Sequence, residues 1–522
     1  MTSPATTAAT TAATTAATTA ATTAATATIT AASAAIAAAG ATPRVATAAG
    51  GTPREPVTTV AGLEPALRQL RDAWQAQPPG YPQRRADLQR LRAALKRRLP
   101  DMAAAIAADF GHRSHDETLL ADGMTVLAGI DHLLRHLRGW MKPRRVGAGW
   151  RLWPARAQLR PMPLGVVGVI APWNYPVNLA LIPLATAIAA GNHVFLKPSE
   201  HTPRTTRFLY ELLAEVFPAT RVAVADGGAE LAGAFAALPF DHLVFTGSTA
   251  VGRKVMAAAA ANLTPLTLEL GGKSPLVLCE DYPLERAAAR LATGKWFNAG
   301  QTCIAPDYVL VVGGERGDAL VQALRAQVAA RYGALSGDAP DYTRIINDAQ
   351  FARLQGYLDE ARARGCEVLP LAATHDPARR LFAPTLVLDP PDDLALMREE
   401  IFGPVLPVLR VDSLEQAIGF IHARPRPLAL YPFSHDRGQV EAILRSTVAG
   451  GVTVNDTLLH FAAENLPFGG VGASGMGAYH GRAGFDALSR MLPVLWQARR
   501  SATDLLRPPY PRIRRMIDLL LR

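Results

Sequence analysis

The strongest chemical signal in the sequence is the cysteine that ends the run Phe297-Asn298-Ala299-Gly300-Gln301-Thr302-Cys303. This cysteine follows a predicted helix and a glycine, so we expect it to lie in a loop. A thiolate is a strong nucleophile, and helix ends or nearby dipoles can lower the pKa of a loop thiol. Cys279 and Cys366 have apolar or charged neighbours and lack this context. The sequence therefore predicts that Cys303 is the nucleophile of a covalent reaction.

Two other side chains could assist that nucleophile. Glu269 lies between two leucines and precedes two glycines, so burial could raise its pKa to a value that suits a general base. The same position would fit a glutamate at a strand end that faces water. Asn174 stands in a loop stiffened by Pro172 and Pro176, where its amide could be held ready for a developing oxyanion. Taken alone, Asn174 is only a turn residue.

Two short motifs could hold a nucleotide. Gly247, Ser248 and Gly252 form a G-x-T-x-x-G pattern between a predicted strand and a helix, whose N-terminus would favour a phosphate. The pattern alone is weak, and an ordinary turn would also fit. Lys197 and Glu200 follow another predicted strand, at the edge where parallel sheets bind ligands. A carboxylate there could accept both hydroxyls of an adenosine ribose, and a solvated loop is the alternative.

Two later segments also contain residues that could take part in chemistry or ligand binding. Glu399 and Glu400 are adjacent acids next to Phe402 and a Gly-Pro turn. Because like charges repel, we expect at least one of the two carboxylates to face a cavity or solvent. The glycine-rich stretch 467–475 is interpreted as a backbone loop near a ligand or a second subunit.

The composition of the 522-residue chain excludes several classes of protein. With 49% apolar and 19% charged residues, the chain can bury a sizeable core and is not disordered throughout. No run of about 20 apolar residues predicts a membrane span. The 3 cysteines exclude a disulfide framework and favour a reducing, cytoplasmic location. His112 and His115 lack further ligands, so we predict no metal site. The net charge of +10 comes mostly from scattered arginines without interleaved aromatics, which argues against nucleic acid as a partner.

The elements that must position these residues follow from the spacing of apolar residues. Residues 1–60 form an Ala/Thr-rich tract without amphipathic periodicity, which we predict to be a disordered tail. Helices are predicted over Leu63–Gln75, Asp87–Leu99 and Thr118–Arg138, followed by a hairpin of strands within Lys142–Leu164. Short apolar runs then alternate with helices twice, which predicts two α/β units with parallel sheets. The predicted strands are Val166–Ile170, Val194–Leu196, Val222–Ala225, Leu243–Phe245, Pro275–Leu278, Tyr308–Val312, Pro404–Leu409 and Val452–Val454.

The motifs and their order resemble those of the NAD(P)-dependent aldehyde dehydrogenase superfamily from about Leu63 to Val494. The matching motifs are Pro-Trp-Asn-Tyr-Pro, Lys-Pro-Ser-Glu, Gly-Ser-Thr-Ala-Val-Gly, Leu-Glu-Leu-Gly-Gly-Lys, Gly-Gln-Thr-Cys and Glu-Ile-Phe-Gly-Pro. Met476–Gly481 and Phe485 look like the class 3-like branch. Ala108–Ser114 and Ala305–Tyr308 look most similar to bacterial coniferyl aldehyde dehydrogenases.

The resemblance implies an α/β architecture with a Rossmann-type cofactor domain, an α/β catalytic domain and a β oligomerisation arm. The expected boundaries are 61–141 and 166–267 for the cofactor domain, 268–448 for the catalytic domain, 142–165 and 449–500 for the arm, and 501–522 for a C-terminal extension. Members of this branch are usually dimers, so a homodimer is expected.

The resemblance also implies a mechanism. Cys303 would attack an aldehyde carbon while the side chain of Asn174 and the backbone N–H of Cys303 hold the oxyanion. After hydride transfer to the nicotinamide, water activated by Glu269 would release a carboxylic acid. A coniferyl-type aromatic aldehyde is the expected substrate. The alternatives are a CoA-acylating dehydrogenase, a cysteine thioesterase and a non-catalytic dimeric scaffold.

Cofactor contacts are carried over in the same way. Lys197 and Glu200 would bind the adenosine ribose, and the turn from Gly247 to Gly252 would approach the pyrophosphate. Glu400 would orient the nicotinamide ribose, with Phe402 beside it. We expect NAD to be the preferred cofactor and NADP to be accepted.

Overall fold

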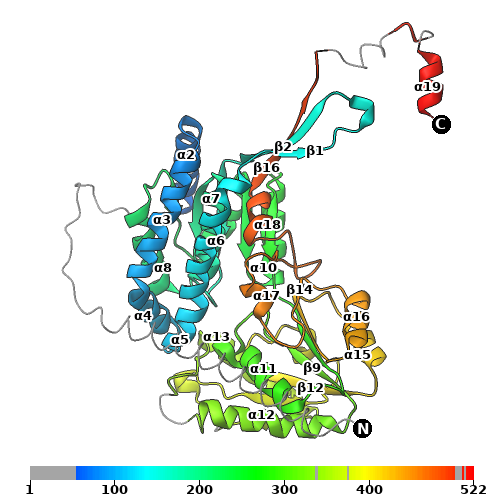
Figure 1. Ribbon diagram of the computed structural model, residues 1–522. Coiled ribbons are helices and arrows are strands. Elements are labelled where there is room, and N and C mark those ends of the chain that lie inside the picture. Colours follow the sequence, from blue (N-terminus) through cyan, green and yellow to red (C-terminus); the bar gives the residue numbers. More distant parts are fainter. Residues whose placement is uncertain (1–54, 336–338, 373–374, 500–507, 511–512, 522) are drawn as a thin grey trace, which may run out of the picture. The chain divides into compact units, whose positions relative to one another are not determined.

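The computed structural model describes residues 55–335, 339–372, 375–499, 508–510 and 513–521 (Figure 1). The chain divides into two compact units, 1–54 and 55–522, and the second of these is described below. Most of the Ala/Thr-rich tail therefore lies outside the described residues. Order begins somewhat earlier than expected, because Val57 pairs with the edge of a sheet through Val224 and Asp226.

The first sheet has six strands in the order β15-β7-β6-β3-β4-β5, and all of them except β15 run parallel. Its strands are β3 (Val166–Ile170), β4 (His193–Lys197), β5 (Val222–Val224), β6 (His242–Thr246), β7 (Leu266–Glu269) and β15 (Gly475–Met476). The chain leaves β3 toward β4 and β5 on one side and returns to β6 and β7 on the other. This order is that of a Rossmann-type sheet, which binds ligands outside the carboxyl ends of its two central strands.

Alternate residues of these strands supply two separate apolar layers, because successive side chains of a strand point to opposite faces. Val167 and Val169 join one hydrophobic cluster, whereas Val166 and Ile170 join another. Helices that contribute apolar side chains to the first cluster are α3 (Tyr81–Arg97), α4 (Leu99–Phe110), α6 (Thr125–Trp140), α7 (Asn178–Ala190) and α8 (Pro203–Val216). Helices on the second face are α2 (Val60–Ala76), α9 (Ala229–Ala236) and α10 (Thr249–Ala260).

The second sheet has seven strands in the order β10-β11-β12-β9-β8-β13-β14, and only β10 is antiparallel. Its strands are β8 (Pro275–Leu278), β9 (Tyr308–Val312), β10 (Glu367–Pro370), β11 (Thr385–Leu388), β12 (Val405–Val411), β13 (Ala429–Phe433) and β14 (Gly451–Val452). The helices of this region are α11 (Leu284–Trp296), α12 (Arg316–Tyr332), α13 (Asp348–Ala363), α14 (Ala395–Arg398), α15 (Leu414–His422), α16 (Arg437–Ser446) and α17 (Leu459–Ala462). Two parallel α/β units in series are thus confirmed.

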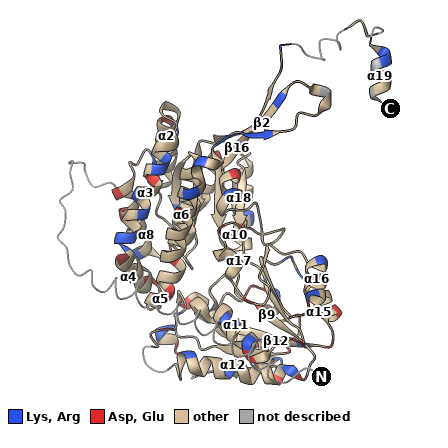
Figure 2. Cartoon of the chain, viewed as in Figure 1, with Lys and Arg blue, Asp and Glu red and all other residues tan. Residues whose placement is uncertain are grey.

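A third, antiparallel sheet has the order β1-β2-β16, in which the hairpin β1 (Arg144–Val146) and β2 (Arg156–Pro163) pairs with β16 (Ser489–Trp496) far along the chain (Figure 1). The predicted hairpin is therefore confirmed. Helix α18 (Gly481–Ala487) leads into β16, and α19 (Arg514–Leu520) lies in the C-terminal extension. Elsewhere, charges of both signs share the surface helices. In Figure 2, basic and acidic residues both occur around α8, where Glu211 pairs with Arg207 of the same helix and with Arg98 at the junction of α3 and α4.

One predicted helix differs from the structure. Thr118–Arg138 was expected to form a single helix, but a π-helical turn (Leu119–Met124) separates α5 (His115–Thr118) from α6. Within that turn the buried carboxylate of Asp122 accepts hydrogen bonds from two backbone N–H groups of another segment. Turns of this kind often occur where a side chain must be aimed at a functional element. Apolar spacing alone does not reveal them.

The expected domain boundaries also shift. The boundary at 267/268 falls inside β7, because Leu266–Glu269 is one strand of the first sheet. Within the expected arm segment 449–500, β14 pairs with the second sheet and β15 with the first, and only β16 joins the hairpin. Pairing between strands that are distant in sequence is not encoded in local apolar spacing.

Candidate active site

The predicted nucleophile follows a strained turn. Helix α11 ends at Trp296, and the next residues include Asn298, Ala299 and Gly300, all with positive φ (53°, 52° and 73°). A Cβ atom on Gly300 would collide with the carbonyl oxygen of Gly403, so this position needs glycine. Strained backbone persists only where its surroundings hold it in place, and it is concentrated at functional sites.

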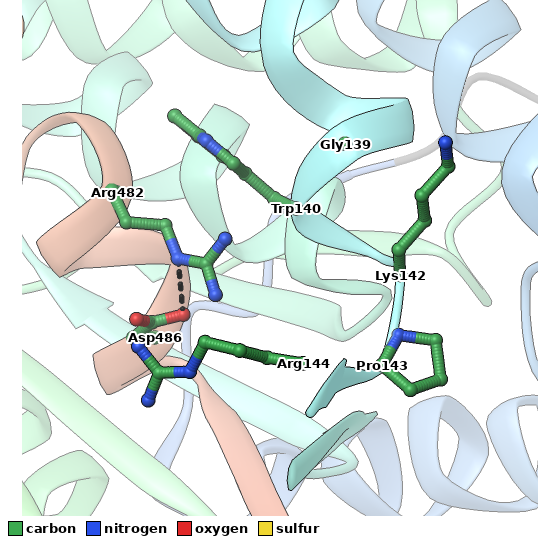
Figure 3. Close-up of a pocket in the computed structure, with 7 residues that line it drawn as sticks. All are labelled: Gly139, Trp140, Lys142, Pro143, Arg144, Arg482 and Asp486. Carbon is green, nitrogen blue, oxygen red and sulfur yellow. Dashed lines mark hydrogen bonds and ion pairs between the residues drawn. The ribbon is translucent and has the colours of Figure 1, made fainter. Parts of the chain in front are cut away.

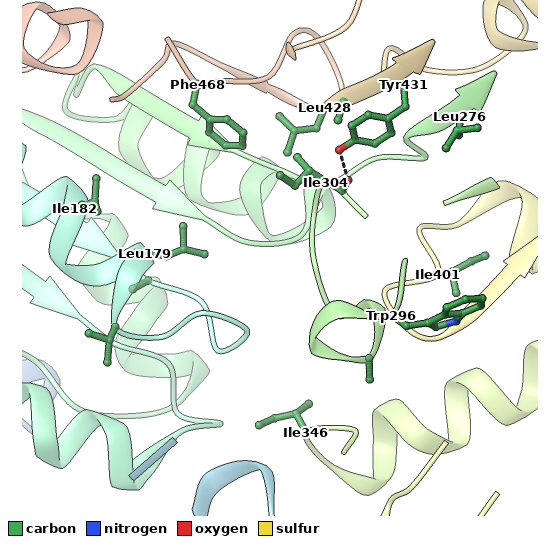
Figure 4. Packing of buried hydrophobic residues seen from close by; sticks show 14 of the residues in the cluster. Leu179, Ile182, Leu276, Trp296, Ile304, Ile346, Ile401, Leu428, Tyr431 and Phe468 are labelled. Carbon is green, nitrogen blue, oxygen red and sulfur yellow. Dashed lines mark hydrogen bonds between the residues drawn. The ribbon is translucent and has the colours of Figure 1, made fainter. Parts of the chain in front are cut away.

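Buried hydrogen bonds hold the loop that carries Cys303. The side chain of Gln301 donates to the carbonyl oxygens of Asn298 and Arg344, at 3.0 Å each, and accepts from the N–H of Ile346 at 3.0 Å. On the other side of the nucleophile, the hydroxyl of Tyr431 on β13 donates to the carbonyl oxygen of Ile304 (Figure 4). The residues on both sides of Cys303 are therefore held by hydrogen bonds to other residues of the second α/β unit.

Asn174 lies beside this loop. It follows β3, is 3% exposed, and its side-chain N–H donates to the carbonyl oxygen of Gln301 at 3.1 Å. The backbone carbonyl of Asn174 in turn accepts from the side chains of Asn298 and Arg113, at 3.1 Å each. The amide has two N–H bonds, so one can anchor the side chain while the second remains available as a donor. The role of Asn174 as an oxyanion donor stays a prediction.

Glu269 is the last residue of β7 and is 2% exposed. Neither of its carboxylate oxygens has a hydrogen-bond partner among the described residues. Burial therefore raises the pKa of Glu269 well above its ordinary value. The alternative of a strand-end glutamate in water is wrong. Its backbone carbonyl accepts from the N–H of Gly247, so the candidate base and the candidate nucleotide turn share one strand edge.

The thiol of Cys303 lies within the electrostatic reach of two acids. Burial raises the pKa of this thiol, and the charges of Glu400 and Glu269 raise it further, whereas the backbone N–H groups of Cys303 and Ile304 lower it. Burial likewise raises the pKa of Glu400, to about 8. Together these influences raise the pKa of the Cys303 thiol above its ordinary value.

The carboxylate of Glu400 lies against Gly271, two residues after the end of β7. A Cβ atom on Gly271 would overlap this carboxylate. The neighbouring acid Glu399 is exposed to solvent and accepts from Tyr357, as expected for the acid pair. Asp307 accepts from the N–H of Ile401 at 3.0 Å and so holds the backbone that carries Glu400.

Two buried lysines lie near the same carboxylates. Lys273 pairs with Asp307 and donates to the carbonyl oxygens of Leu396 (2.7 Å) and Glu399 (3.0 Å). Lys295 is fully buried, and its ammonium has no hydrogen-bond partner among the described residues. Burial lowers the pKa of Lys295 to about 8. Sequence reasoning missed these residues as parts of the site, although Lys273 and Asp307 stand inside segments that it singled out.

At the other end of the first sheet's ligand edge, Lys197 closes β4 and is 2% exposed. Its ammonium pairs with the carboxylate of Glu200 at 2.8 Å. Partial burial alone would raise the pKa of Glu200, but hydrogen bonds from Lys197 and the backbone, together with the charges of Lys197 and His201, outweigh it, so the pKa lies below its ordinary value. Glu200 is therefore a charged, half-exposed acceptor.

The turn after β6 has the geometry predicted for a strand-turn-helix motif. Ser248 is the N-cap of α10 and accepts from the N–H of Val251 at 3.4 Å. Gly252 packs against β7's end, because a Cβ atom there would lie 2.5 Å from Leu270. A packing requirement thus accounts for this glycine, and contact of Gly252 with a cofactor stays a prediction. Phe402 has positive φ (48°) and packs edge-on against Trp173 at 5.3 Å.

The candidate residues thus form two groups: Glu269, Glu400 and Asn174, which act on Cys303 or contact its loop, and Lys197, Glu200 and the 247–252 turn, which lie at the carboxyl ends of β4 and β6. A pocket of about 470 Å³ elsewhere is lined by Gly139, Trp140, Lys142, Pro143, Arg144, Arg482 and Asp486 (Figure 3). None of its lining residues belongs to either group, so the pocket at the base of the arm is distinct from the candidate active site.

Two further searches of the described part of the chain gave negative results. No helix there is both long and apolar enough to span a bilayer. No cluster of three or more His, Cys, Asp or Glu side chains in that part could bind a metal ion.

Comparison with known proteins agrees with this geometry. Residues 56–492 match the aldehyde dehydrogenase family. The "Probable coniferyl aldehyde dehydrogenase" of Pseudomonas aeruginosa is 49% identical over 86% of this chain and 94% of its own length. The coniferyl aldehyde dehydrogenase of Pseudomonas sp. strain HR199 is 46% identical over 78% of this chain and 85% of its own.

Solved structures agree as well. Substrate-bound AldH of Staphylococcus aureus superposes with a TM-score of 0.84 at 37% identity, covering 88% of this chain and 99% of that one. An aldehyde dehydrogenase of Mycobacterium tuberculosis complexed with NAD+ gives a TM-score of 0.75 at 28% identity, covering 85% and 91%. The chain therefore belongs to the aldehyde dehydrogenase family and is an NAD(P)-dependent enzyme that oxidises aldehydes.

Proposed function

We propose that this enzyme oxidises an aromatic aldehyde of the coniferyl aldehyde type to its carboxylic acid, with Cys303 as nucleophile, Glu269 as general base and Asn174 as oxyanion donor. The observation that carries the proposal is the buried carboxylate of Glu269, which has no hydrogen-bond partner among the described residues and acts electrostatically on the thiol of Cys303. A buried acid without a partner costs folding free energy, so its retention suggests use in chemistry.

In the acylation half of the reaction, the sulfur of Cys303 adds to the aldehyde carbon and the carbonyl oxygen becomes an oxyanion. The free N–H of Asn174 and the backbone N–H of Cys303 stabilise that charge. Because the side chain of Asn174 is already anchored to Gln301, little reorganisation is needed as charge develops. Loss of hydride from the adduct leaves a thioester on the sulfur.

In the second half, Glu269 takes a proton from water as the water oxygen adds to the thioester carbon. The C–S bond then breaks, Cys303 leaves as a thiolate, and the carboxylic acid is released. A raised pKa makes Glu269 a stronger base once it is ionised.

The residues fit a nicotinamide dinucleotide. Glu400 has a buried carboxylate oxygen without a described partner, and Glu200 is a charged acceptor at the strand edge. We propose that Lys197 and Glu200 hold the adenosine ribose, that Gly247, Ser248 and Gly252 form the pyrophosphate turn, and that Glu400 and Phe402 adjoin the nicotinamide ribose. When bound, this cofactor supplies the hydride acceptor.

The aromatic character of the substrate is supported by the names of the two Pseudomonas relatives and by ring-bearing side chains next to the nucleophile. Tyr175 follows Asn174 and hydrogen-bonds to Thr302, which precedes Cys303. The ring of Tyr175 stacks on Phe297 with centroids 6.5 Å apart. We propose that aromatic side chains so near the nucleophile favour aromatic over short aliphatic aldehydes.

The decisive test compares coniferyl aldehyde with aliphatic aldehydes by absorbance of reduced nicotinamide. We expect the highest kcat/KM for the hydroxycinnamyl aldehyde, no requirement for CoA and a free carboxylic acid as product. A strict requirement for CoA would establish the acylating alternative. Thioester hydrolysis without any nicotinamide reduction would establish a thioesterase, and absence of both activities would leave a scaffold.

Cofactor choice gives a separate prediction. We expect NAD to be preferred and NADP to be accepted, because Glu200 repels a 2′-phosphate while Lys197 attracts it. Repulsion between charges at contact distance costs about 1 kcal/mol in water-like surroundings, or severalfold in kcat/KM. Glu200→Gln should reduce the ratio of kcat/KM for NAD to that for NADP. Glu211→Gln removes a carboxylate of the next helix, α8, and should leave this ratio unchanged. Equal kcat/KM values in the wild type, unchanged by Glu200→Gln, would remove Glu200 from the cofactor site.

We further propose a homodimer formed through the arm. We also propose the domain division expected from the sequence, with the boundary at 267/268 moved past Glu269. The arm strand β16 pairs only with β2 in the described chain and exposes Leu492, Leu495 and Trp496. Exposed apolar side chains on a sheet edge favour association. Light scattering should give twice the chain mass, and Leu495→Arg should give a monomer. A wild-type monomer would contradict this.

A further inference from the structure

A buried ion pair lies behind the loop that carries Asn174. Arg113, in the segment between α4 and α5, and Asp122, in the π-helical turn, are both fully buried, and their side chains approach to 3.2 Å. Burial of two charges is costly unless each also makes further contacts. Both residues make further contacts that offset this cost.

Arg113 contacts the loop that carries Asn174. Its guanidinium donates to the backbone carbonyl of Asn174 at 3.1 Å. The guanidinium carbon also lies 5.3 Å from the centroid of the Phe110 ring and 4.9 Å from that of the Tyr175 ring. A planar cation with two ring contacts and a hydrogen bond has little freedom, so it fixes the position of the carbonyl that it contacts.

Asp122 fixes the other end of the same loop. One carboxylate oxygen accepts from the N–H groups of Val177 (3.1 Å) and Asn178 (2.9 Å), at the first turn of α7. A carboxylate at a helix N-terminus satisfies donors that the helix leaves unpaired. The ion pair therefore joins the backbone of residue 174 to the start of α7, and the three residues between them are clamped at both ends.

We propose that Arg113 and Asp122 are positioning residues that hold Asn174 where its side chain can stabilise the oxyanion. The inference rests on the proposed role of Asn174, and neither member of the pair touches the reacting atoms. The side chain of Asn298 is the other donor to the carbonyl oxygen of Asn174, so loss of Arg113 removes one of two anchors and lets the amide shift. Displacement of a catalytic group by about 1 Å can slow a reaction by about 100-fold.

A double-mutant cycle tests this. Arg113→Met is measured in the wild type and in an Asn174→Ala background, with three readouts: the rate of the first burst of reduced nicotinamide, the dissociation constant of NAD and the melting temperature. We expect Arg113→Met to slow the burst at least about tenfold with NAD affinity unchanged. In the Asn174→Ala background the same change should slow it less than about twofold, because nothing remains to be positioned.

Two further variants deal with loss of stability. Arg113→Met leaves Asp122 as an uncompensated buried charge, so Arg113→Met/Asp122→Asn should recover the melting temperature but not the burst rate. Arg113→Lys keeps a donor and should recover part of that rate. Arg92→Met is the matched control, since Arg92 forms an ion pair with Asp131 between α3 and α6 away from the site.

The outcomes separate the inference from the proposed function. If Asn174→Ala slows the burst and Arg113→Met slows it by the same factor in both backgrounds, Arg113 acts independently of Asn174 and the inference is wrong. The inference is also wrong if the burst rate recovers together with the melting temperature in the double variant. If Asn174→Ala leaves the burst unchanged, the oxyanion assignment fails and the inference fails with it.

Discussion

Cys303→Ser should lower aldehyde oxidation to less than about a thousandth of the wild-type rate, a loss of about 4 kcal/mol in transition-state stabilisation. A serine hydroxyl is not ionised near neutral pH and is a much weaker nucleophile than a thiolate. The candidate base cannot compensate, because Glu269 and Glu400 would both oppose a second negative charge beside them. Steady-state assays of reduced nicotinamide formation measure this effect.

The serine variant should retain its fold and its affinity for NAD, because serine differs from cysteine by one atom and Gln301 and Tyr431 still anchor the loop. Melting temperature and calorimetric NAD binding check this. Cys366→Ser is the matched control, since Cys366 is half-buried after α13, and it should keep full activity. A Cys303→Ser enzyme that retained a tenth of the wild-type turnover would rule out this cysteine as the nucleophile.

The fold could be predicted from sequence wherever local apolar spacing decides structure. Val166–Ile170, Pro275–Leu278 and Tyr308–Val312 have the same bounds as predicted, because continuous apolar runs of this length are stable only as strands buried on both faces. The π-helical turn at Leu119–Met124 could not be predicted, since its cause is the hydrogen bonding of Asp122 to a segment more than 50 residues away.

Some residues of the candidate site could likewise be predicted from the sequence, and others could not. Residue types and motif order led to the prediction of Cys303, Glu269 and Asn174 as catalytic residues, and their roles stay predictions. Arg113 was not selected as a site residue, because nothing in its local sequence reveals contact with Asn174. Its role depends on burial and on long-range pairing, and both arise only when α4, the π-helical turn and β3's loop come together.

The environment of Glu269 also could not be read from its flanking leucines alone. Those leucines suggested partial desolvation, but the structure gives a carboxylate with no described hydrogen-bond partner at all. Glu400, buried nearby, has its pKa raised as well. Burial raises the pKa of both acids, and the charges of both raise the pKa of the Cys303 thiol, so ionisation of the thiol is coupled to that of each acid.

This coupling leads to the second prediction with a large effect. Glu269→Gln should slow release of the carboxylic acid by about 100-fold or more while acylation changes much less, since the amide preserves shape but cannot take a proton from water. Rapid mixing should show a burst of reduced nicotinamide close to one equivalent per active site, followed by slow turnover. Glu280→Gln, at an exposed position just after strand β8, should behave like the wild type.

The pH dependence sharpens the test. Burial places the pKa of Glu269 well above its ordinary value, so at low pH the carboxyl group is protonated and cannot act as a base. Thioester hydrolysis in the wild type should therefore rise with pH through that raised pKa and then level off. In Glu269→Gln the slow phase should lose this rise and follow only the supply of hydroxide. A burst lost together with turnover, or a Glu269→Gln profile that keeps the wild-type shape, would show that Glu269 is not the base for deacylation.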